Sequence, residues 1–391
     1  MATVSAVESS PLGVSSAIQP TSGKQRLLSL DAFRGLTIAA MILVNDPGTW
    51  SAAYAPLLHA EWNGWTPTDL VFPFFLFIMG VAMEFSFASR REAIAAGAPA
   101  KSITLHIIYR AAIIFALGLF LHLFPFYPWH RVRIMGVLQR IAVCYLFAAL
   151  IAIKSRTATR IAAVAALLFG YWALMTLVPV PGYGAGHLDQ DGNLAAYIDR
   201  ALMGGHLWKP TWDPEGLLST LPAIATTLLG GFAGQWLRSS ASHVRKLSGL
   251  LATGAVGLAL GELWNLWFPI NKNLWTSSYV VFTGGFACIL LALCYWLIEV
   301  RQWKQWAHPF VVFGKNAIAA FVFSVLLAKI LLVWKVTDAG KRTSLWTFLY
   351  QHIFAPLGSP RFTSLLFALT FVLICWAAMF VLYRRKIFFK I

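Results

Sequence analysis

Long apolar runs alternate with short polar intervals along almost the whole of this 391-residue chain. Most runs hold about 18–25 residues, the length at which a helix crosses the hydrocarbon core of a bilayer. The runs are continuous, whereas strands of a membrane barrel alternate apolar and polar residues over about ten positions. The pattern therefore predicts an all-α, polytopic transmembrane helical bundle. About ten spans are expected, at residues 34–45, 70–89, 103–124, 137–153, 161–180, 217–237, 248–268, 275–298, 310–334 and 361–383.

Two segments outside these spans also have a recognisable character. Residues 1–23 are rich in Ser, Ala, Pro and Gly, without a basic stretch followed by an apolar one, so we expect a disordered leader and not a signal peptide. Residues 345–358 are apolar but too short and too broken to span, which predicts an interfacial or re-entrant helix. The remaining chain, residues 24–391, is then expected to form one transmembrane domain.

Composition and charge agree with a membrane protein. The chain is 59% hydrophobic and 12% charged, against roughly 25% charged residues in soluble domains. Its net charge of +16 comes from basic residues in short turns, which is explained by membrane topology and not by nucleic-acid binding. With the N-terminus inside, seventeen basic residues lie on the inner side and ten on the outer side, which predicts two cytoplasmic termini. The four cysteines lie inside apolar runs without CxxC spacing, so neither disulfides nor a metal site are expected.

The interval between the first two apolar runs, residues 45–69, carries most of the polar chemistry of the N-terminal half. It contains no Lys or Arg, although loops that only anchor a membrane protein usually carry such charges. Its polar side chains suit binding or proton transfer: Asn45, Asp46, His59, Glu61, Asn63 and Asp69. We interpret this interval as a functional site.

Six stretches between about Leu30 and Asn316 follow one another in a distinctive order: LDAFRGLTIAAMILVN, HAEWNGWTPTDLVFPFFLFIMG, RIMGVLQRIAVCY, WDPEGLLSTLPAI, PINKNLWTSSYVVFTGG and HPFVVFGKNAI. Together they resemble the transmembrane heparan-alpha-glucosaminide N-acetyltransferase family, and the chain looks like a bacterial relative. The resemblance implies transfer of an acetyl group from cytosolic acetyl-CoA to a glucosamine amine across the membrane. By the same resemblance, His59 corresponds to the active-site histidine, Asn45 to the asparagine ending the first span and Asp69 to the family's aspartate. A homodimer in a bacterial inner membrane would suit the family.

The chemistry of an acetyl transfer explains why these residue types matter. An amine that attacks a thioester needs a base and a donor to the developing oxyanion. A histidine has an ordinary pKa near 6.5, so His59 can accept the proton or can itself take the acetyl group. Asp69 can hold the imidazole in one tautomer, but it also ends a Thr66-Pro-Thr-Asp capping box that would start the second span. Asn45 can donate to the oxyanion or can simply cap the first span.

Polar residues at the span ends are the candidates for substrate binding, because charges near a membrane interior are costly. For acetyl-CoA we expect Arg34, Lys315, Asn316 and Arg140. For the amino sugar we expect Trp62, Glu61, Asp213, Glu215 and Asn271. Structural explanations stay open: Arg34 can pair with Asp31, Arg140 can extend toward lipid headgroups, and Trp62 can belong to an interfacial belt.

Two other functions compete with an N-acetyltransferase. A carrier of amino sugars or their oligomers would also place polar groups within a helical bundle, but it should show internal repeats and discontinuous helices. We find no convincing repeat between the two halves of the sequence. An O-acyltransferase of an envelope glycan would differ only in the acceptor atom. All three functions require the lipid bilayer, and none requires a nucleic acid or a metal.

Overall fold

Helices dominate the fold, as the apolar pattern predicts. The computed structural model describes residues 27–95, 97 and 100–389, so the predicted leader at residues 1–23 lies outside them. The helices are α1 (Leu28–Asn45), α2 (Val71–Ala95), α3 (Ala100–Leu123), α4 (Val137–Lys154), α5 (Thr157–Leu177), α6 (Leu194–Met203), α7 (Thr220–Arg238), α8 (His243–Asn265), α9 (Ser277–Tyr295), α10 (His308–Lys315), α11 (Ala317–Val333), α12 (Leu345–Leu349) and α13 (Pro360–Arg384). The sequence did not predict an antiparallel hairpin, β1 (Lys335–Asp338) with β2 (Lys341–Ser344).

The predicted polytopic bundle is confirmed, but the count of ten spans is only partly matched. Among the described residues, eight helices are long and apolar enough to cross a bilayer. The predicted ninth span is divided into α10 and α11, which bend by 74° around Asn316. Helix α7 occupies the predicted sixth span but is not among the eight. By length and composition the described residues thus contain eight candidate spans, or nine if the bent pair counts as one.

Helix α7 lies inside the bundle, which explains why it can be less apolar than its neighbours. Thr226 and Thr227 are almost completely buried and donate to backbone carbonyls one turn earlier in the helix. Its contact with α2 is made by glycines: a Cβ on Gly230 would lie 1.9 Å from the Phe77 carbonyl oxygen, and one on Gly80 would lie 1.9 Å from that of Thr227. A helix enclosed by protein does not need an apolar surface toward lipid.

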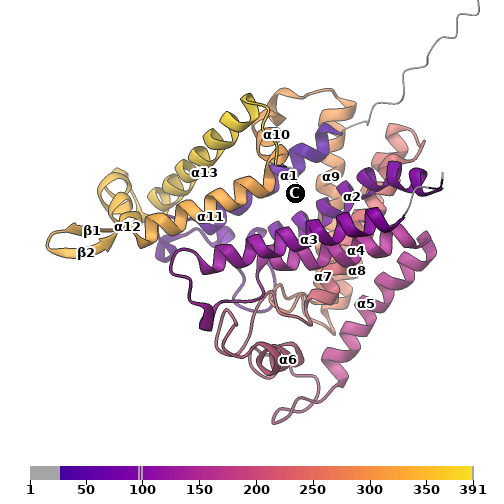
Figure 1. Cartoon of the computed structure of the whole chain (residues 1–391), viewed down its shortest axis with the longest axis horizontal. Coiled ribbons are helices and arrows are strands. Elements are labelled where there is room, and N and C mark those ends of the chain that lie inside the picture. The colour runs from indigo at the N-terminus through magenta and orange to yellow at the C-terminus, as the bar shows by residue number, and fades with distance from the viewer. Residues whose placement is uncertain (1–26, 96, 98–99, 390–391) are drawn as a thin grey trace, which may run out of the picture.

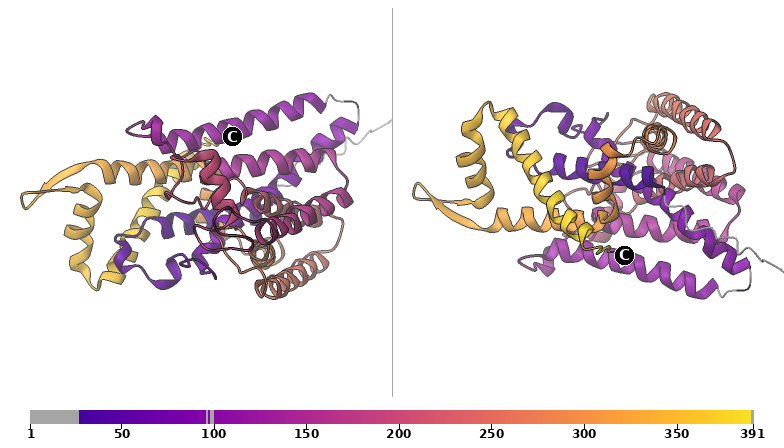
Figure 2. Two further views of the ribbon diagram at one scale, coloured as in Figure 1. Left: turned by 90° about the horizontal axis from the view of Figure 1, so that it is seen from below. Right: turned by 90° about the horizontal axis from the view of Figure 1, so that it is seen from above.

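Two hydrophobic clusters divide the bundle. The larger cluster joins α2, α3, α4, α7 and α9, and a second joins α1, α11, α12 and α13. Figure 1 shows α11, α12 and α13 on one side of the molecule and α3, α4 and α5 on the other, with α1 and α2 between them. The two further views in Figure 2 show the same separation. Helices α1 and α2 therefore link both parts of the bundle, and the loop joining them carries His59.

The predicted interfacial or re-entrant helix exists as a short irregular element. Helix α12 continues into a π-helical turn at Tyr350–Phe354 and a 3₁₀ turn at Ala355–Leu357. Trp346 is buried against α13, and its indole nitrogen donates to the Gly48 carbonyl oxygen at 3.3 Å. This element therefore packs on the bundle and anchors the start of the loop between α1 and α2, while its depth in a bilayer stays a prediction.

Connecting segments gather at two opposite ends of the bundle. In Figure 1 the end of α2, the start of α3 and the turn between α4 and α5 lie at the right, whereas the α3–α4 loop and the β-hairpin lie at the left. Loops of the second end are bonded to each other: the Ile134 amide donates to His206 (3.1 Å), and the Gly64 amide donates to Ile270 (2.8 Å). The His59 loop belongs to this second end, which the charge bias predicts to be the outer one.

A matched pair of glycines in α7 tests the packing of α7 on α2. Gly230→Ala should lower the thermal transition of the detergent-purified protein by several degrees, because overpacking costs about 1–3 kcal/mol. Gly231→Ala should leave the transition unchanged or raise it, since no atom lies within 4 Å of its added methyl group and alanine favours helix by about 1 kcal/mol. Equal transitions for the two variants would contradict the close contact at Gly230.

Candidate active site

The Asp69 carboxylate organises the loop between α1 and α2. Its Oδ1 lies 2.6 Å from His59 Nδ1, and its Oδ2 accepts from the backbone amides of Ala60 and Thr66, both at 3.0 Å. The Thr66 side chain completes the predicted capping box at the 3₁₀ turn Pro67–Leu70, which leads into α2. Asp69 therefore caps the helix and holds the histidine at the same time. The two roles that the sequence left open coexist.

The contact with Asp69 fixes the chemical state of the His59 ring. An ionised carboxylate can only accept hydrogen bonds, so Nδ1 carries the proton and Nε2 carries the free lone pair. The Asp69 side chain is 1% exposed, while the His59 side chain is 43% exposed. The buried partner holds the ring and the open partner meets the substrate, which is the arrangement that a general base or a nucleophile requires.

The loop between α8 and α9 closes the other side of the site. Asn271 is completely buried; its amide nitrogen donates to Asn63 Oδ1 at 3.1 Å, and its Oδ1 accepts from the Leu274 amide at 2.9 Å. The Tyr279 hydroxyl donates to the backbone carbonyl of Asp69. Asn271 was predicted to bind the acceptor, but its side chain is used to join the two loops. Its direct contact with an acceptor stays a prediction.

The sequence offered Lys272 only as part of a polar turn, residues 271–273, that could bind the acceptor, and did not predict its position beside His59. Its Nζ lies 3.0 Å from His59 Nδ1, 3.1 Å from His59 Nε2 and 3.7 Å from Asp69 Oδ1. An atom almost equidistant from both ring nitrogens at this range must lie over the face of the imidazole. Burial lowers the pKa of the Lys272 ammonium, against the opposing effect of the Asp69 and Glu215 carboxylates. One sequence feature could have drawn attention to Lys272: it lies in a predicted outer loop, and lysines are less frequent in outer loops than in cytoplasmic ones.

A buried cluster of ions lies beside this loop. Arg133 donates from Nε to Asp213 Oδ2 at 2.8 Å and from Nη2 to Glu215. Burial alone would raise the pKa of Glu215, but the positive charges of Arg133, Arg140 and Lys272 lower it. Both acids, predicted to bind the acceptor, are thus already paired with arginine. Through Glu215 the cluster is electrostatically connected to Lys272.

Arg140 is completely enclosed in the first turn of α4. Its Nη2 donates to the Gly216 carbonyl oxygen at 3.1 Å and to Ser219, and its guanidinium lies 5.1 Å from the centre of the Trp275 ring. Its Nε and Nη1 have no hydrogen-bond partner in the described part of the chain. The predicted approach to lipid headgroups is therefore excluded by burial. Arg140 lies beside the Arg133 cluster, away from Arg34, Lys315 and Asn316, which were predicted for the same cofactor.

The tryptophan predicted to stack on a sugar begins a row of aromatic rings. Trp62 donates from its indole nitrogen to the Leu188 carbonyl oxygen at 2.8 Å, and its ring lies 5.1 Å from that of Trp212. Trp212 in turn lies 5.8 Å from Trp208, which is 53% exposed. Glu61 is exposed next to Trp62 in the sequence. This row extends from the His59 loop to the surface of the long loop between α5 and α7.

Four predicted residues are not brought next to His59. Asn45 is exposed at the end of α1 and forms no hydrogen bond with His59 in the described chain. Arg34 donates to Asp31 and to the Gly314 carbonyl oxygen, both at 3.3 Å. The remaining two predicted residues contact the C-terminal tail: the Lys315 ammonium lies 4.6 Å from the ring centre of Tyr383, and the Asn316 side chain bonds to the backbone of Ile387 and Phe389, both at 3.0 Å.

Comparison with known proteins identifies the family of this chain. Residues 26–259 match the family described as "Heparan-alpha-glucosaminide N-acetyltransferase, catalytic". The chain belongs to this family. The human heparan-alpha-glucosaminide N-acetyltransferase is 30% identical over 425 aligned positions, which cover 94% of this chain, and the mouse protein is 30% identical over 429, which cover 95%. The chain spans 60% and 61% of the length of these two relatives.

Membership of the heparan-alpha-glucosaminide N-acetyltransferase family confirms the resemblance stated from the six motifs. His59 and Asp69 lie inside the matched range 26–259, whereas Asn271, Lys272 and Lys315 lie beyond it. The long apolar helices and the family together identify an integral membrane protein. Within the described residues no group of three or more His, Cys, Asp or Glu side chains is arranged to hold a metal ion.

Removal of the imidazole tests the site without disturbing the fold. His59→Ala should lower acetyl transfer by about 10²–10⁴-fold, the usual contribution of a general base. The thermal transition should stay nearly unchanged, because a partly exposed loop side chain contributes little packing. Activity is measured with labelled acetyl-CoA and glucosamine.

The matched control for this variant is His352→Ala, which removes a similarly exposed imidazole that is paired with Asp338 at 2.8 Å. It should transfer acetyl groups at the wild-type rate. Asp69→Asn should lose part of the activity and also some thermal stability, because Asp69 caps α2. Wild-type turnover in His59→Ala would refute the catalytic assignment.

Proposed function

We propose that this protein is an integral membrane acetyltransferase that transfers an acetyl group from cytoplasmic acetyl-CoA to the amine of a glucosamine-type sugar on the opposite side of the membrane. The observation that supports this proposal most directly is the His59–Asp69 pair with Lys272 over the imidazole, in a chain of the N-acetyltransferase family. The residues supply a base, a group that orients it and a positive charge within 3.1 Å of the reacting nitrogen.

In the proposed transfer the acceptor amine forms a bond to the acetyl carbon, and the carbon–sulfur bond of the thioester breaks. His59 Nε2 takes the proton that the amine loses and returns it to the leaving thiolate, so the imidazole is neutral again after each turnover. Asp69 keeps Nδ1 protonated throughout. The same Nε2 is also the atom that would carry the acetyl group if transfer proceeded through His59. Both routes depend on the same tautomer.

Lys272 is proposed to stabilise the oxyanion that forms beside His59. A fixed positive charge near the reacting carbonyl is worth more in a partly buried site than in water. The same charge disfavours a second positive charge on the imidazole and so favours proton return to the thiolate. Asn45 was predicted for this task, but its exposed position at the end of α1 gives it no contact with the ring.

The acceptor is proposed to approach from the loops around Trp62. Glu61 is exposed and free to bind sugar hydroxyl or amine groups, and the row of Trp62, Trp212 and Trp208 offers apolar faces on which sugar rings can stack. Asp213 and Glu215 act here through Arg133, which they bind and whose guanidinium lies 6.0 Å from the centre of the Trp208 ring. A direct contact of either acid with the sugar would require exchange of that ion pair.

The direction of transfer is tested with sealed, uniformly oriented vesicles. Acetyl-CoA is supplied only on the cytoplasmic face and glucosamine only on the opposite face. Acetylated sugar should appear on the glucosamine face and stay there, because the acetyl group crosses and neither substrate does. Vesicles with His59→Ala serve as the blank. Product on the acetyl-CoA face would refute the proposed direction.

A carrier keeps one structural argument in its favour, the discontinuous pair α10 and α11. The polar groups at that break are bonded to the C-terminal tail and not to the His59 loop, so the break is separate from the proposed site. The same vesicles decide this point, since a carrier would deliver glucosamine to the acetyl-CoA face.

An O-acyltransferase is tested with N-acetylglucosamine, whose amine is blocked. This sugar should not accept an acetyl group, and its acetylation would instead support an O-acyltransferase.

The charge of Lys272 can be tested by substitution and by pH. Lys272→Met should lower kcat/KM by roughly 10²-fold, as removal of an oxyanion donor does. Because burial lowers the pKa of Lys272, wild-type activity should fall on the alkaline side at a lower pH than an ordinary lysine would give. Lys272→Arg should retain activity and move this decline to higher pH, since a guanidinium stays charged.

Lys335→Met removes an exposed lysine of β1 and is the matched control, which should keep both the rate and the pH profile. The role assigned to Lys272 would be wrong if Lys272→Met kept the wild-type rate across the whole pH range. It would also be wrong if the alkaline limb were the same in Lys272→Arg and wild type.

A further inference from the structure

Arg110 lies within a membrane-spanning helix, and its charge has no partner among the described residues. It belongs to the apolar segment Ile103–Leu123 of α3. Its guanidinium lies over the Tyr145 ring, 4.8 Å from the ring centre, and forms no hydrogen bond or ion pair with any described residue. A charged side chain in such a helix costs at least about 2.5–3.5 kcal/mol on insertion scales. The ring face offsets only part of that cost, so the charge requires another explanation.

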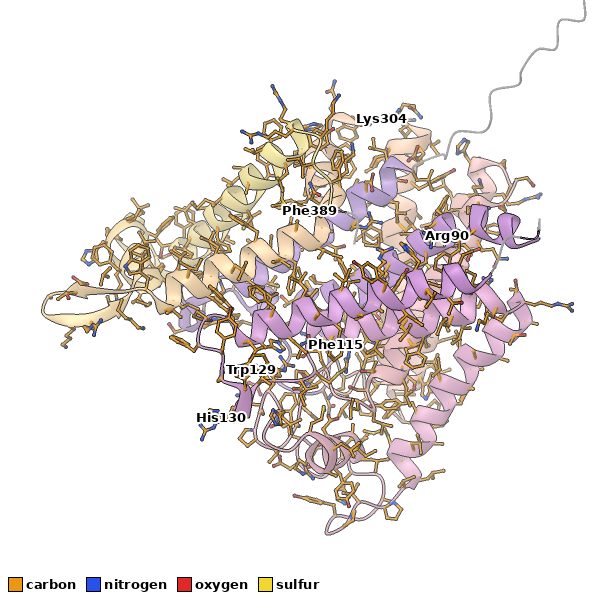
Figure 3. All side chains as sticks on the ribbon, in the orientation of Figure 1. Arg90, Phe115, Trp129, His130, Lys304 and Phe389 are labelled. Atoms are coloured by element: carbon orange, nitrogen blue, oxygen red, sulfur yellow. The ribbon has the colours of Figure 1, made fainter. Side chains whose placement is uncertain are left out.

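The groups around Arg110 add positive charge and do not cancel it. His106 lies one turn earlier on α3 and is within electrostatic range of both Arg90 and Arg110. Arg90 comes from the inner part of α2, and Figure 3 shows it beside α3. Glu84, the acid one and a half turns earlier on α2, bonds to Arg160 at 3.3 Å and approaches Arg238 at 3.7 Å. Positive groups from two helices therefore meet without a carboxylate assigned to them among the side chains that the structure describes.

Two buried hydrogen-bond donors at this position, the Tyr145 hydroxyl and Arg110 Nε, are also unpaired in the described chain. Tyr145 is 1% exposed, and its hydroxyl group has no hydrogen-bond partner in the described chain; the same holds for the buried Nε of Arg110. Buried polar groups are nearly always bonded in native proteins. The cluster is also open to a ligand on one side, because His106 is exposed and only 22% of the span that carries Arg110 is buried. A donor set of this kind suits the oxygen atoms of a phosphate group.

We propose that Arg110, with Arg90, His106 and Tyr145, forms a binding site for a phosphate group of a phosphorylated ligand. If the proposed acetyl transfer is correct, this ligand is the nucleotide end of coenzyme A; the same chemistry would bind the headgroup of an anionic phospholipid. Coenzyme A is favoured because the residues predicted for it are engaged elsewhere: Arg34 with Asp31, and Lys315 with the C-terminal rings.

Position along α3 agrees with this assignment. Arg110 lies thirteen residues before Leu123, the last residue of α3, which corresponds to about 20 Å along the helix axis. The His59 loop lies at the end of the bundle to which Leu123 leads. A ligand with its phosphates at Arg110 would therefore have to extend an uncharged arm toward the outer end to reach His59. The pantetheine arm of coenzyme A is such a group, whereas burial of the phosphates nearer to His59 would be far more costly.

The site is tested by binding experiments on the full chain in detergent, without acceptor. Coenzyme A, adenosine 3′,5′-bisphosphate and pantetheine, which has no phosphate, are titrated against wild type, Arg110→Gln and Tyr145→Phe. Arg110→Gln should weaken binding of the two phosphorylated ligands by about 10- to 100-fold, the loss of one or two charge-assisted hydrogen bonds. Pantetheine binding should not change. Arg131→Gln removes an exposed outer arginine as the matched control and should bind like wild type.

A second experiment distinguishes a lipid headgroup from coenzyme A as the ligand. The ligand-free protein is placed in nanodiscs of phosphatidylglycerol or phosphatidylcholine, and the thermal transitions are compared. A stabilisation by phosphatidylglycerol that Arg110→Gln loses, with unchanged coenzyme A affinity, would identify a lipid headgroup as the ligand. Equal behaviour of Arg110→Gln and wild type in both arms would overturn the site. If Arg110→Gln does not fold, Tyr145→Phe decides, with a loss of about 3- to 10-fold expected for one neutral hydrogen bond.

The outcome is independent of the proposed function. Binding of phosphorylated ligands is measured on the wild-type protein and the Arg110 variant in the absence of an acceptor, so it does not require acetyl transfer. Failure of acetyl transfer with intact, Arg110-dependent binding would therefore refute the transferase and not the phosphate site.

Discussion

The site and the fold depend on one carboxylate, that of Asp69. One oxygen holds His59 Nδ1, and the other accepts from two backbone amides that would otherwise be unpaired at the start of α2. Its backbone carbonyl accepts from Tyr279 of α9. The ring that performs the proposed chemistry is therefore fixed by the same group that begins the most central helix. Precise placement of His59 follows from helix capping, and a separate supporting loop is not required.

Close contacts between helices hold α1 and α2, and with them the ends of the His59 loop, in place within the bundle. Gly80 and Gly230 let α2 and α7 approach until backbone meets backbone, and α7 lies inside the protein as a result. Gly35 and Gly314 bring α1 and α10 together in the same way, with an added Cβ on Gly35 lying 1.7 Å from the Phe310 carbonyl oxygen. Because α1 and α2 are each fixed by a second helix, the ends of the His59 loop have little freedom to separate. A rigid scaffold of this kind suits a site in which an ångström of displacement affects the rate.

The sequence could predict what depends on local pattern or on residues near in the chain. Helices followed from apolar runs because a backbone in lipid must satisfy its own hydrogen bonds, and the contact between His59 and Asp69 spans only ten residues. Lys272 reaches His59 from 213 residues away, a distance that no local pattern encodes. Hydropathy alone did not show that other helices surround α7 and its buried threonines, or that the ninth predicted span bends at Asn316, whose side chain bonds to the C-terminal tail. The engagement of Lys315 by the C-terminal rings was likewise a matter of tertiary contacts, whereas the pairing of Arg34 with Asp31, three residues away, was one of the alternatives that the sequence offered.

The distribution of paired charge finally separates the two ends of the protein. Near His59 two cations face carboxylates: Arg133 meets Asp213 and Glu215, and Lys272 meets Asp69. These two cations need no ligand to compensate their charge, whereas the buried Arg140 is held by the Gly216 carbonyl oxygen and Ser219 and not by a carboxylate. On the other half of the bundle the cations Arg90 of α2 and Arg110 of α3 have no such partner in the described chain. The proposed phosphate site lies there: in this arrangement a negatively charged ligand binds at the Arg110 half of the bundle, and its uncharged, reacting part extends to the end that carries His59.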